Sequence, residues 1–118
     1  MAAGVVHIPI YATLGRKYSL ADGIVDMLAP ATLGYGATKY TVQRSRDDRF
    51  NHRVLVWFNS KDDWYRFWEG PEAIEFRARF MGQYQVPITY VWHDEIGSDA
   101  DVTTGVRTSA DVDVELAS

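Results

Sequence analysis

Strand-like and helix-like segments follow one another along this chain in the order β-α-β-β-α-β. This order predicts an α+β fold of the ferredoxin-like class, with a four-stranded antiparallel sheet and two helices on one face. The length of 118 residues is enough for one core, and 47% hydrophobic residues exclude a disordered chain. We expect one domain over residues 1–96 and an acidic C-terminal tail over residues 97–118.

The first two elements are a strand and a short helix. Residues 5–12 form a short apolar stretch that is rich in β-branched side chains, which favours a strand. Ser19 and Asp22 have the spacing of a capping box, so a helix is expected to begin there. Pro30 lacks a backbone N–H and is expected to end this helix.

A hairpin is predicted next. Residues 38–44 alternate as a strand with one polar face, and residues 53–58 form a nearly continuous apolar strand. The connection contains the mixed-sign cluster over residues 44–49. This mixture favours a solvated hairpin tip over an anion site.

The second helix and the last strand complete the order. Asn59 or Ser60 is expected to cap a helix that is broken or kinked at residues 70–71, where the sequence is Gly-Pro, and that ends at Gly82. Residues 86–92 are predicted to form the fourth strand.

Both faces of the predicted sheet are apolar. In the first strand, alternation places Val5, Pro9 and Tyr11 on the face opposite to Val6, Ile8 and Ile10. In the third strand it places Leu55 and Trp57 on the face opposite to Val54, Val56 and Phe58. Two helices cover only one face, so the other needs a cover. We expect a homodimer in which two sheets pack face to face as an eight-stranded barrel. The alternative is a monomer covered by its own tail.

Charge is distributed unevenly. Seven acids and one base in residues 94–118 give −6, whereas the whole chain is −4 and residues 1–93 carry +2. The absence of a basic face argues against nucleic acid as a partner. No apolar run is long enough to span a membrane, and no basic N-terminal region resembles a signal peptide, so we expect a cytoplasmic protein. The tail is expected either to be disordered or to clasp the partner subunit.

Residues 57–71, with the sequence WFNSKDDWYRFWEGP, resemble the third-strand-to-second-helix segment of the antibiotic-biosynthesis-monooxygenase-like proteins. In that family a strand ends in an aromatic residue, Ser or Glu begins the helix, and Trp precedes Gly-Pro. The element order over residues 5–94 also resembles this dimeric α+β barrel superfamily. Its members include cofactor-independent monooxygenases, haem-degrading monooxygenases, polyketide cyclases and isomerases.

The resemblance to the haem-degrading branch can be tested on individual positions. That branch has an Asn on the first strand, a Trp before Gly-Pro and an axial His on the second helix. By this resemblance, the matching positions in this chain are occupied by Pro9, by Phe67 (with Trp68 adjacent) and by Phe76. The Phe76 side chain has no atom that binds iron. There is no cysteine, no phosphate-binding Gly-rich loop and no metal-ligand spacing. We therefore expect no cofactor and no metal.

The fold implies a ligand pocket between the sheet and the helices, and the sequence offers candidates to line it. His7 is expected to be either a hydrogen-bonded core histidine or a general base, and Tyr11 is a second candidate base. Arg77 is expected either to pair with Glu69 or Asp94 or to stabilise an oxyanion, a role also open to Asn59. His52 and His93 stand at strand ends and are expected to be solvated. The expected substrate-binding wall, which could equally be ordinary core, consists of Tyr40, Trp64, Phe67, Trp68, Phe76 and Phe80.

These residues and the resemblance together predict a small homodimeric enzyme that acts, without a bound organic cofactor, on an aromatic or polyketide-like hydrophobic molecule. The reaction would be an oxygenation or a cyclisation. The alternative is a non-catalytic homodimeric ligand-binding or assembly module of the same fold.

Overall fold

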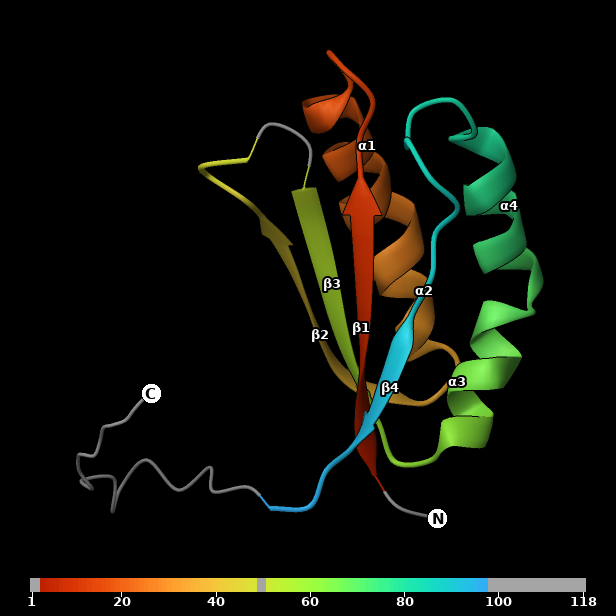
Figure 1. Cartoon of the computed structure of the whole chain (residues 1–118). Helices are drawn as coiled ribbons and strands as arrows, with labels where there is room; N and C mark the ends of the chain where they lie inside the picture. The colour runs from red at the N-terminus through yellow and green to blue at the C-terminus, as the bar shows by residue number, and fades with distance from the viewer. Residues whose placement is uncertain (1–2, 49–50, 98–118) are drawn as a thin grey trace, which may run out of the picture.

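The computed structural model describes residues 3–48 and 51–97, which form one sheet with helices on one side (Figure 1). The strands pair antiparallel in the order β2-β3-β1-β4, as the ferredoxin-like prediction requires. The expected tail, apart from Gly97, lies outside the described residues. The elements are β1 (Gly4–Tyr11), α1 (Lys17–Gly23), η1 (Ile24–Leu28), α2 (Ala29–Leu33), β2 (Ala37–Arg44), β3 (Asn51–Phe58), α3 (Lys61–Trp68), α4 (Pro71–Arg79) and β4 (Val91–Asp94).

Strand alternation creates the core, as predicted. Val6, Ile8 and Ile10 of β1 face the helices and are at most 1% exposed. Val54 and Val56 of β3 lie opposite them in register and are fully buried. Burying a side chain of this size contributes about 1.5–3 kcal/mol, so this central strand pair fixes which side chains face outward.

The first helical segment is longer than predicted, and the expectation that Pro30 ends it is wrong. The chain passes from α1 through the π-helical turn η1 into α2, where Pro30 occupies the first turn. A proline in a first turn loses no intrahelical bond, and the wider π turn before it rearranges the ladder. The capping box is wrong too: Arg16 is the N-cap residue and has no side-chain cap bond, while the Ser19 hydroxyl donates to Gln83 over 2.8 Å.

The second helical segment follows the prediction. The backbone N–H of Asp62 donates to Ser60 Oγ over 3.1 Å, so Ser60 caps α3. The helix stops at Trp68 and restarts at Pro71, the first residue of α4. The Gly-Pro pair therefore divides one predicted helix into two.

The last strand is shorter than the predicted strand over residues 86–92. Only Val91–Asp94 forms β4, which pairs with the start of β1. Earlier, Tyr84 bridges Ala12, and the backbone N–H of Gln85 donates to the Tyr11 carbonyl over 2.7 Å. Pro87 has no N–H for a ladder, so the chain leaves the sheet and rejoins it at Val91.

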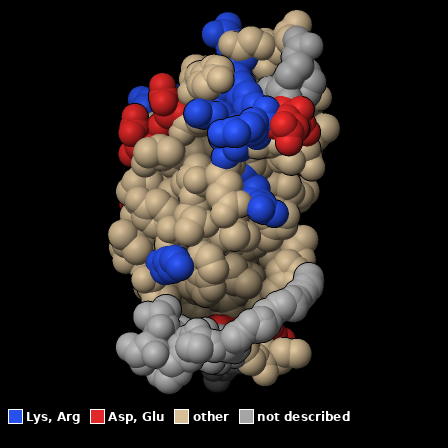
Figure 2. Space-filling model, turned by 90° about the vertical axis from the view of Figure 1, so that its left-hand side faces the viewer, with Lys and Arg blue, Asp and Glu red and all other residues tan. Residues whose placement is uncertain are grey.

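The face of the sheet away from the helices carries apolar side chains towards the start of β1, as alternation predicts. Val5, Leu55 and Trp57 are half-buried there, and Val91 is exposed. We call this side the open face. Figure 2 shows the molecule from the side opposite the helices: Lys and Arg gather in its upper part, above a broad surface with few charges.

Candidate functional site

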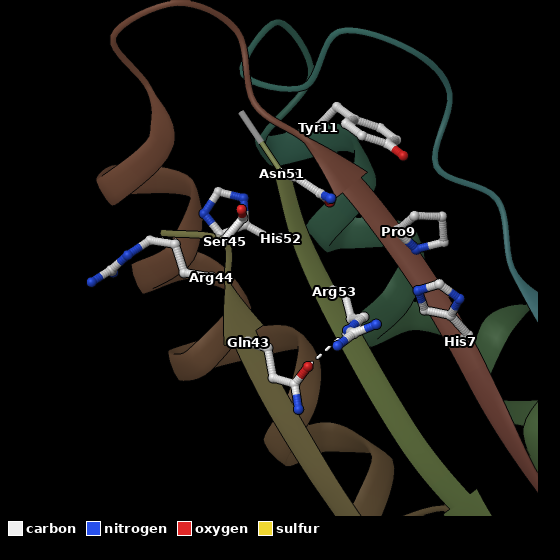
Figure 3. A pocket seen from close by; sticks show the side chains of 9 residues that line it. All are labelled: His7, Pro9, Tyr11, Gln43, Arg44, Ser45, Asn51, His52 and Arg53. Carbon is white, nitrogen blue, oxygen red and sulfur yellow. Dashed lines mark hydrogen bonds between the residues drawn. The ribbon is translucent and has the colours of Figure 1, made fainter. Parts of the chain in front are cut away.

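A pocket of about 340 Å³ lies at the upper end of the open face, where β1, β2 and β3 end near the β2–β3 connection (Figure 3). We call it the His7 pocket. Among the described residues no Asp or Glu lines it. Its lining residues are His7, Pro9, Tyr11, Gln43, Arg44, Ser45, Asn51, His52 and Arg53.

His7 is placed on the open face by its neighbours Val6 and Ile8, which point under the helices. Partial burial lowers the pKa of His7 below its ordinary value of 6.5, and the positive charges of Arg53 and His93 lower it further. His7 is therefore mainly neutral at pH 7, and a neutral imidazole has a nitrogen free to accept a proton.

Arg53 lies on the same side of the sheet as His7, opposite Pro9 in register. Its Nε donates to Gln43 Oε1 over 2.7 Å, which holds the guanidinium beside β2. Among the described residues it forms no ion pair with an acid. Asn51 adds a buried Oδ1 atom without a hydrogen-bond partner among them. The pocket thus presents a positive charge and unused polar atoms beside a neutral base.

His52 is fully buried, so the expectation that it is solvated is wrong. Its Nε2 lies 2.9 Å from the Lys17 carbonyl oxygen and ties β3 to the start of α1. Burial lowers its pKa despite this bond. His93, by contrast, is exposed as expected. Sequence reasoning also missed Asn51 and Arg53 as lining residues, although strand parity could have placed Arg53 on the same face as Leu55 and Trp57.

Most aromatic residues of α3 and α4 pack in or against the core on the other side of the sheet. Trp64, Phe67 and Phe76 have no exposed surface. The Trp64 ring stacks on Trp68 with 5.2 Å between centroids, and Tyr90 meets Trp64 edge-on at 4.9 Å. These contacts fill the space in which the sequence-based prediction placed a ligand pocket.

Phe80 and Tyr40 also pack against this core. The Phe80 ring lies 4.8 Å from Phe76 between centroids, and Tyr40 stands opposite Val56 on the helix side of the sheet. All six predicted wall residues therefore lie on the helix side, whereas His7 and Tyr11 lie on the open face.

The two predicted oxyanion partners also lie away from His7. Arg77 stacks on the Trp68 ring at 4.1 Å and donates to the Trp68 carbonyl over 3.1 Å, instead of pairing with Glu69 or Asp94. Its Nη1 is buried without a partner among the described residues. Asn59 follows the lower end of β3, roughly 13 Å along the strand from Leu55, which stands opposite His7. The structure does not assemble the predicted residues into one site.

Within residues 3–48 and 51–97, no three His, Asp or Glu side chains cluster as metal ligands. In the same part of the chain no helix is long and apolar enough to cross a membrane.

Solved structures with this architecture come from several bacteria. A Nitrosomonas europaea protein with the provisional name antibiotic biosynthesis monooxygenase superposes with a TM-score of 0.71 at 11% identity, over 80% of this chain and 91% of its own. A Bordetella bronchiseptica protein with the same provisional name gives 0.70 at 14%, over 81% and 99%. The fold is that of the antibiotic-biosynthesis-monooxygenase-like proteins. The predicted resemblance is confirmed at the level of fold.

Sequence similarity adds no closer relationship. No protein-family model matches the chain, and no curated protein matches it significantly. A conserved Bacteroides thetaiotaomicron protein of unknown function has the same fold, with a TM-score of 0.66 at 6% identity, over 78% of this chain and 98% of its own. At such identities the likeness establishes the fold, and the chemistry has to be argued from the site.

Proposed function

We propose that the chain is a cofactor-independent enzyme that acts on an aromatic or polyketide-like small molecule in the His7 pocket. The observation that carries the proposal is a pocket of about 340 Å³ with a neutral imidazole and an unpaired guanidinium on the same wall. Pockets of this size hold one small planar molecule. Fold neighbours with the provisional name of monooxygenase support this reaction class.

The chemistry begins with a proton transfer. The His7 imidazole takes a proton from an acidic C–H or phenolic O–H of the substrate, and the Arg53 guanidinium stabilises the resulting enolate or phenolate oxygen. Arg53 thereby takes the role that the sequence suggested for Arg77 or Asn59. Tyr11, 38% exposed at the rim, is the second candidate base.

The deprotonated substrate, which carries carbanion character, can react in two ways without a cofactor. In oxygenation, a methylene compound and dioxygen give a ketone and water: the substrate loses four electrons, one oxygen atom becomes the carbonyl, and the other leaves as water. In cyclisation, the carbanion attacks a carbonyl of the same molecule, one carbon–carbon bond forms, and the proton returns from His7 to the new alkoxide.

A second copy of the chain belongs to the proposal. The half-buried Val5, Leu55 and Trp57 give the open face an apolar patch that a homodimer would cover. Val5 and Trp57 lie towards the opposite end of the strands from Tyr11 and Asn51, and Leu55 stands opposite His7, so a partner seated on the patch would reach His7 and leave the Tyr11 end of the pocket at the edge of the interface.

The test is turnover of planar phenols and methylene ketones under labelled dioxygen, followed by mass spectrometry. We expect one labelled oxygen atom in the product for oxygenation, or an isomeric ring product for cyclisation. His7→Gln should lower the rate by roughly 100-fold or more, because it removes the base. The control His93→Gln changes an exposed histidine on the same face; it lets the pKa of His7 rise towards 6.5, so at pH 8, where His7 stays neutral, it should keep the activity. Equal rates for the two variants would remove His7 from the mechanism.

A non-catalytic homodimeric binding or assembly module is the second candidate function. The complete burial of Trp64, Phe67 and Phe76 favours it, because these rings act as core. This candidate predicts ligand binding with neither oxygen gain nor ring closure for any compound in the same panel.

A further inference from the structure

A second cleft adjoins the His7 pocket. It has a volume of about 510 Å³ and lies between α1 and the upper end of β2. Arg44, Ser45 and His52 line both hollows, so the two meet at the base of the β2–β3 connection. We call the second one the α1 cleft. Its remaining lining residues are Lys17, Tyr18, Ala21, Val25, Val42 and Arg46.

The charged side chains that line the two hollows are all basic: Lys17, Arg44, Arg46 and Arg53. Asp47 and Asp48 follow in the same connection, but among the described residues no Asp or Glu lines either hollow. Among the described residues none of the four forms an ion pair with an acid. Neighbouring cations repel one another, and an anion between them relieves that repulsion.

The contacts of these cations separate structural from available groups. Lys17 Nζ donates to the Ser45 carbonyl over 2.7 Å and to the Asp48 carbonyl over 2.6 Å, so it holds the hairpin turn in place. Arg44 stacks on the Tyr18 ring at 4.6 Å, which orients its guanidinium and leaves its N–H donors at the edges. Arg46 is exposed at the mouth of the cleft.

The floor of the α1 cleft is apolar. Ala21 of α1 and Val25 of η1 line it together with Val42 of β2, and Val25 is 49% exposed. Tyr18, 67% exposed, adds a flat ring. An apolar floor under cationic side chains suits an organic anion, whose hydrocarbon part covers the floor while its acidic group meets the arginines.

We propose that the substrate of the His7 pocket is an elongated acid: Arg44 and Arg46 hold its carboxylate in the α1 cleft, and its chain passes the wall that the two hollows share, so that the reacting ring lies beside His7. The placement of the ring rests on the function proposed above, whereas the carboxylate site rests on the cleft itself. A planar guanidinium binds a carboxylate through two parallel hydrogen bonds. The sequence favoured a solvated tip over an anion site for residues 44–49, and the described part of that cluster supplies both arginines.

The experiment compares three planar probes by isothermal titration calorimetry at low ionic strength: hydroxynaphthoate, naphthol and naphthyl phosphate. We expect hydroxynaphthoate to bind at least about 10-fold more tightly than naphthol, and Arg46→Gln to lower its affinity about 3- to 10-fold without changing that of naphthol. Arg44→Gln should act in the same direction. Arg16→Gln is the matched control, because Arg16 is exposed near the start of α1 and lines neither hollow.

Each other outcome counts against the proposal. Equal affinities for hydroxynaphthoate and naphthol would overturn it, as would an unchanged preference in the Arg44→Gln, Arg46→Gln double variant. Tighter binding of naphthyl phosphate than of hydroxynaphthoate would overturn the carboxylate assignment.

The same variants separate this inference from the proposed function. His7→Gln should keep the preference for the carboxylate probe while it loses turnover. If no compound is turned over but the preference depends on Arg46, the carboxylate site stands and the proposed enzyme fails. If neutral phenols are turned over as fast as their carboxylates, the enzyme stands and this inference fails.

Discussion

Gly23→Ala should destabilise the fold although alanine is the better helix former. Gly23 is buried at the junction of α1 and η1, with helical backbone angles that any residue adopts. A Cβ at this position would overlap the Phe80 ring, three of whose atoms lie closer than ordinary contact. Phe80 itself packs against Phe76 and the core. The ring must therefore move, or the helix must shift away from α4.

The size of the effect follows from two opposing contributions. Overpacking costs about 1–3 kcal/mol, and the helix propensity of alanine returns about 1 kcal/mol. We expect a net loss of about 1 kcal/mol in the free energy of unfolding and a Tm lower by roughly 3–6 °C. Urea unfolding followed by circular dichroism measures both the stability and the slope.

The control is Gly34→Ala at the end of α2, where the nearest atom is the Ala31 carbonyl oxygen at an ordinary 3.5 Å and the backbone is also helical. This variant should be neutral or slightly more stable. In a double-mutant cycle, Phe80→Leu should recover about 1 kcal/mol of the Gly23→Ala loss by opening space. Additive losses, or a stabilised Gly23→Ala protein, would refute the close packing and would free Phe80 for a role in ligand binding.

Two further predictions concern the open face. Arg53→Gln removes a positive charge that lowers the pKa of His7, so that pKa should rise towards 6.5. Since the base works only when it is neutral, the acid limb of kcat/KM against pH should move to higher pH. A limb that does not move relative to a Lys39→Gln control on the same face would count against the His7–Arg53 pair. Leu55→Asp places a charge in the apolar patch and should raise the dissociation constant of the homodimer, measured by light scattering, by at least about 100-fold, because both copies lose the contact. Leu33→Asp, at an exposed position on α2, should leave the dimer intact. A wild-type protein that scatters as a monomer would contradict the dimer.

Much of the fold could be predicted from local patterns. The alternation of Val6 and Ile8 fixed the orientation of β1, and the hydroxyl of Ser60 before two acids marked the start of α3. Pro71 marked the restart of the helix. These signals act over a few residues, so one sequence is sufficient to read them.

The errors arise where tertiary contacts override local rules. Pro30 does not end its helix, because the π turn before it changes the hydrogen-bond ladder. His52 stands near a strand end but is buried under α1, where the Lys17 carbonyl is its partner. Neither the π turn nor the contact of His52 with Lys17 has a signature in nearby residues.

The error in the site has a different origin. The parity of β1 already separates His7 from Ile8, and the periodicity of α3 already places Trp64 and Phe67 in the core. The prediction assigned all of them to one pocket because the fold class suggested a site under the helices. Strand parity was the stronger signal, since a shift by one residue moves every side chain to the other face.

In the proposed homodimeric enzyme, the open face would make partner binding and proton transfer interdependent. Val6 and Ile8, held beneath the helices, keep His7 facing outward, and Leu55 of the apolar patch stands directly opposite His7 in register. Burial is the main reason why the pKa of His7 is low in a single copy. A second copy seated on Leu55 would remove more water from the imidazole, and Arg53 would still oppose its protonation. Dimer formation would therefore hold His7 neutral down to a lower pH while making it a weaker base, so the surface that stabilises the assembly would also set the pH range in which the base works.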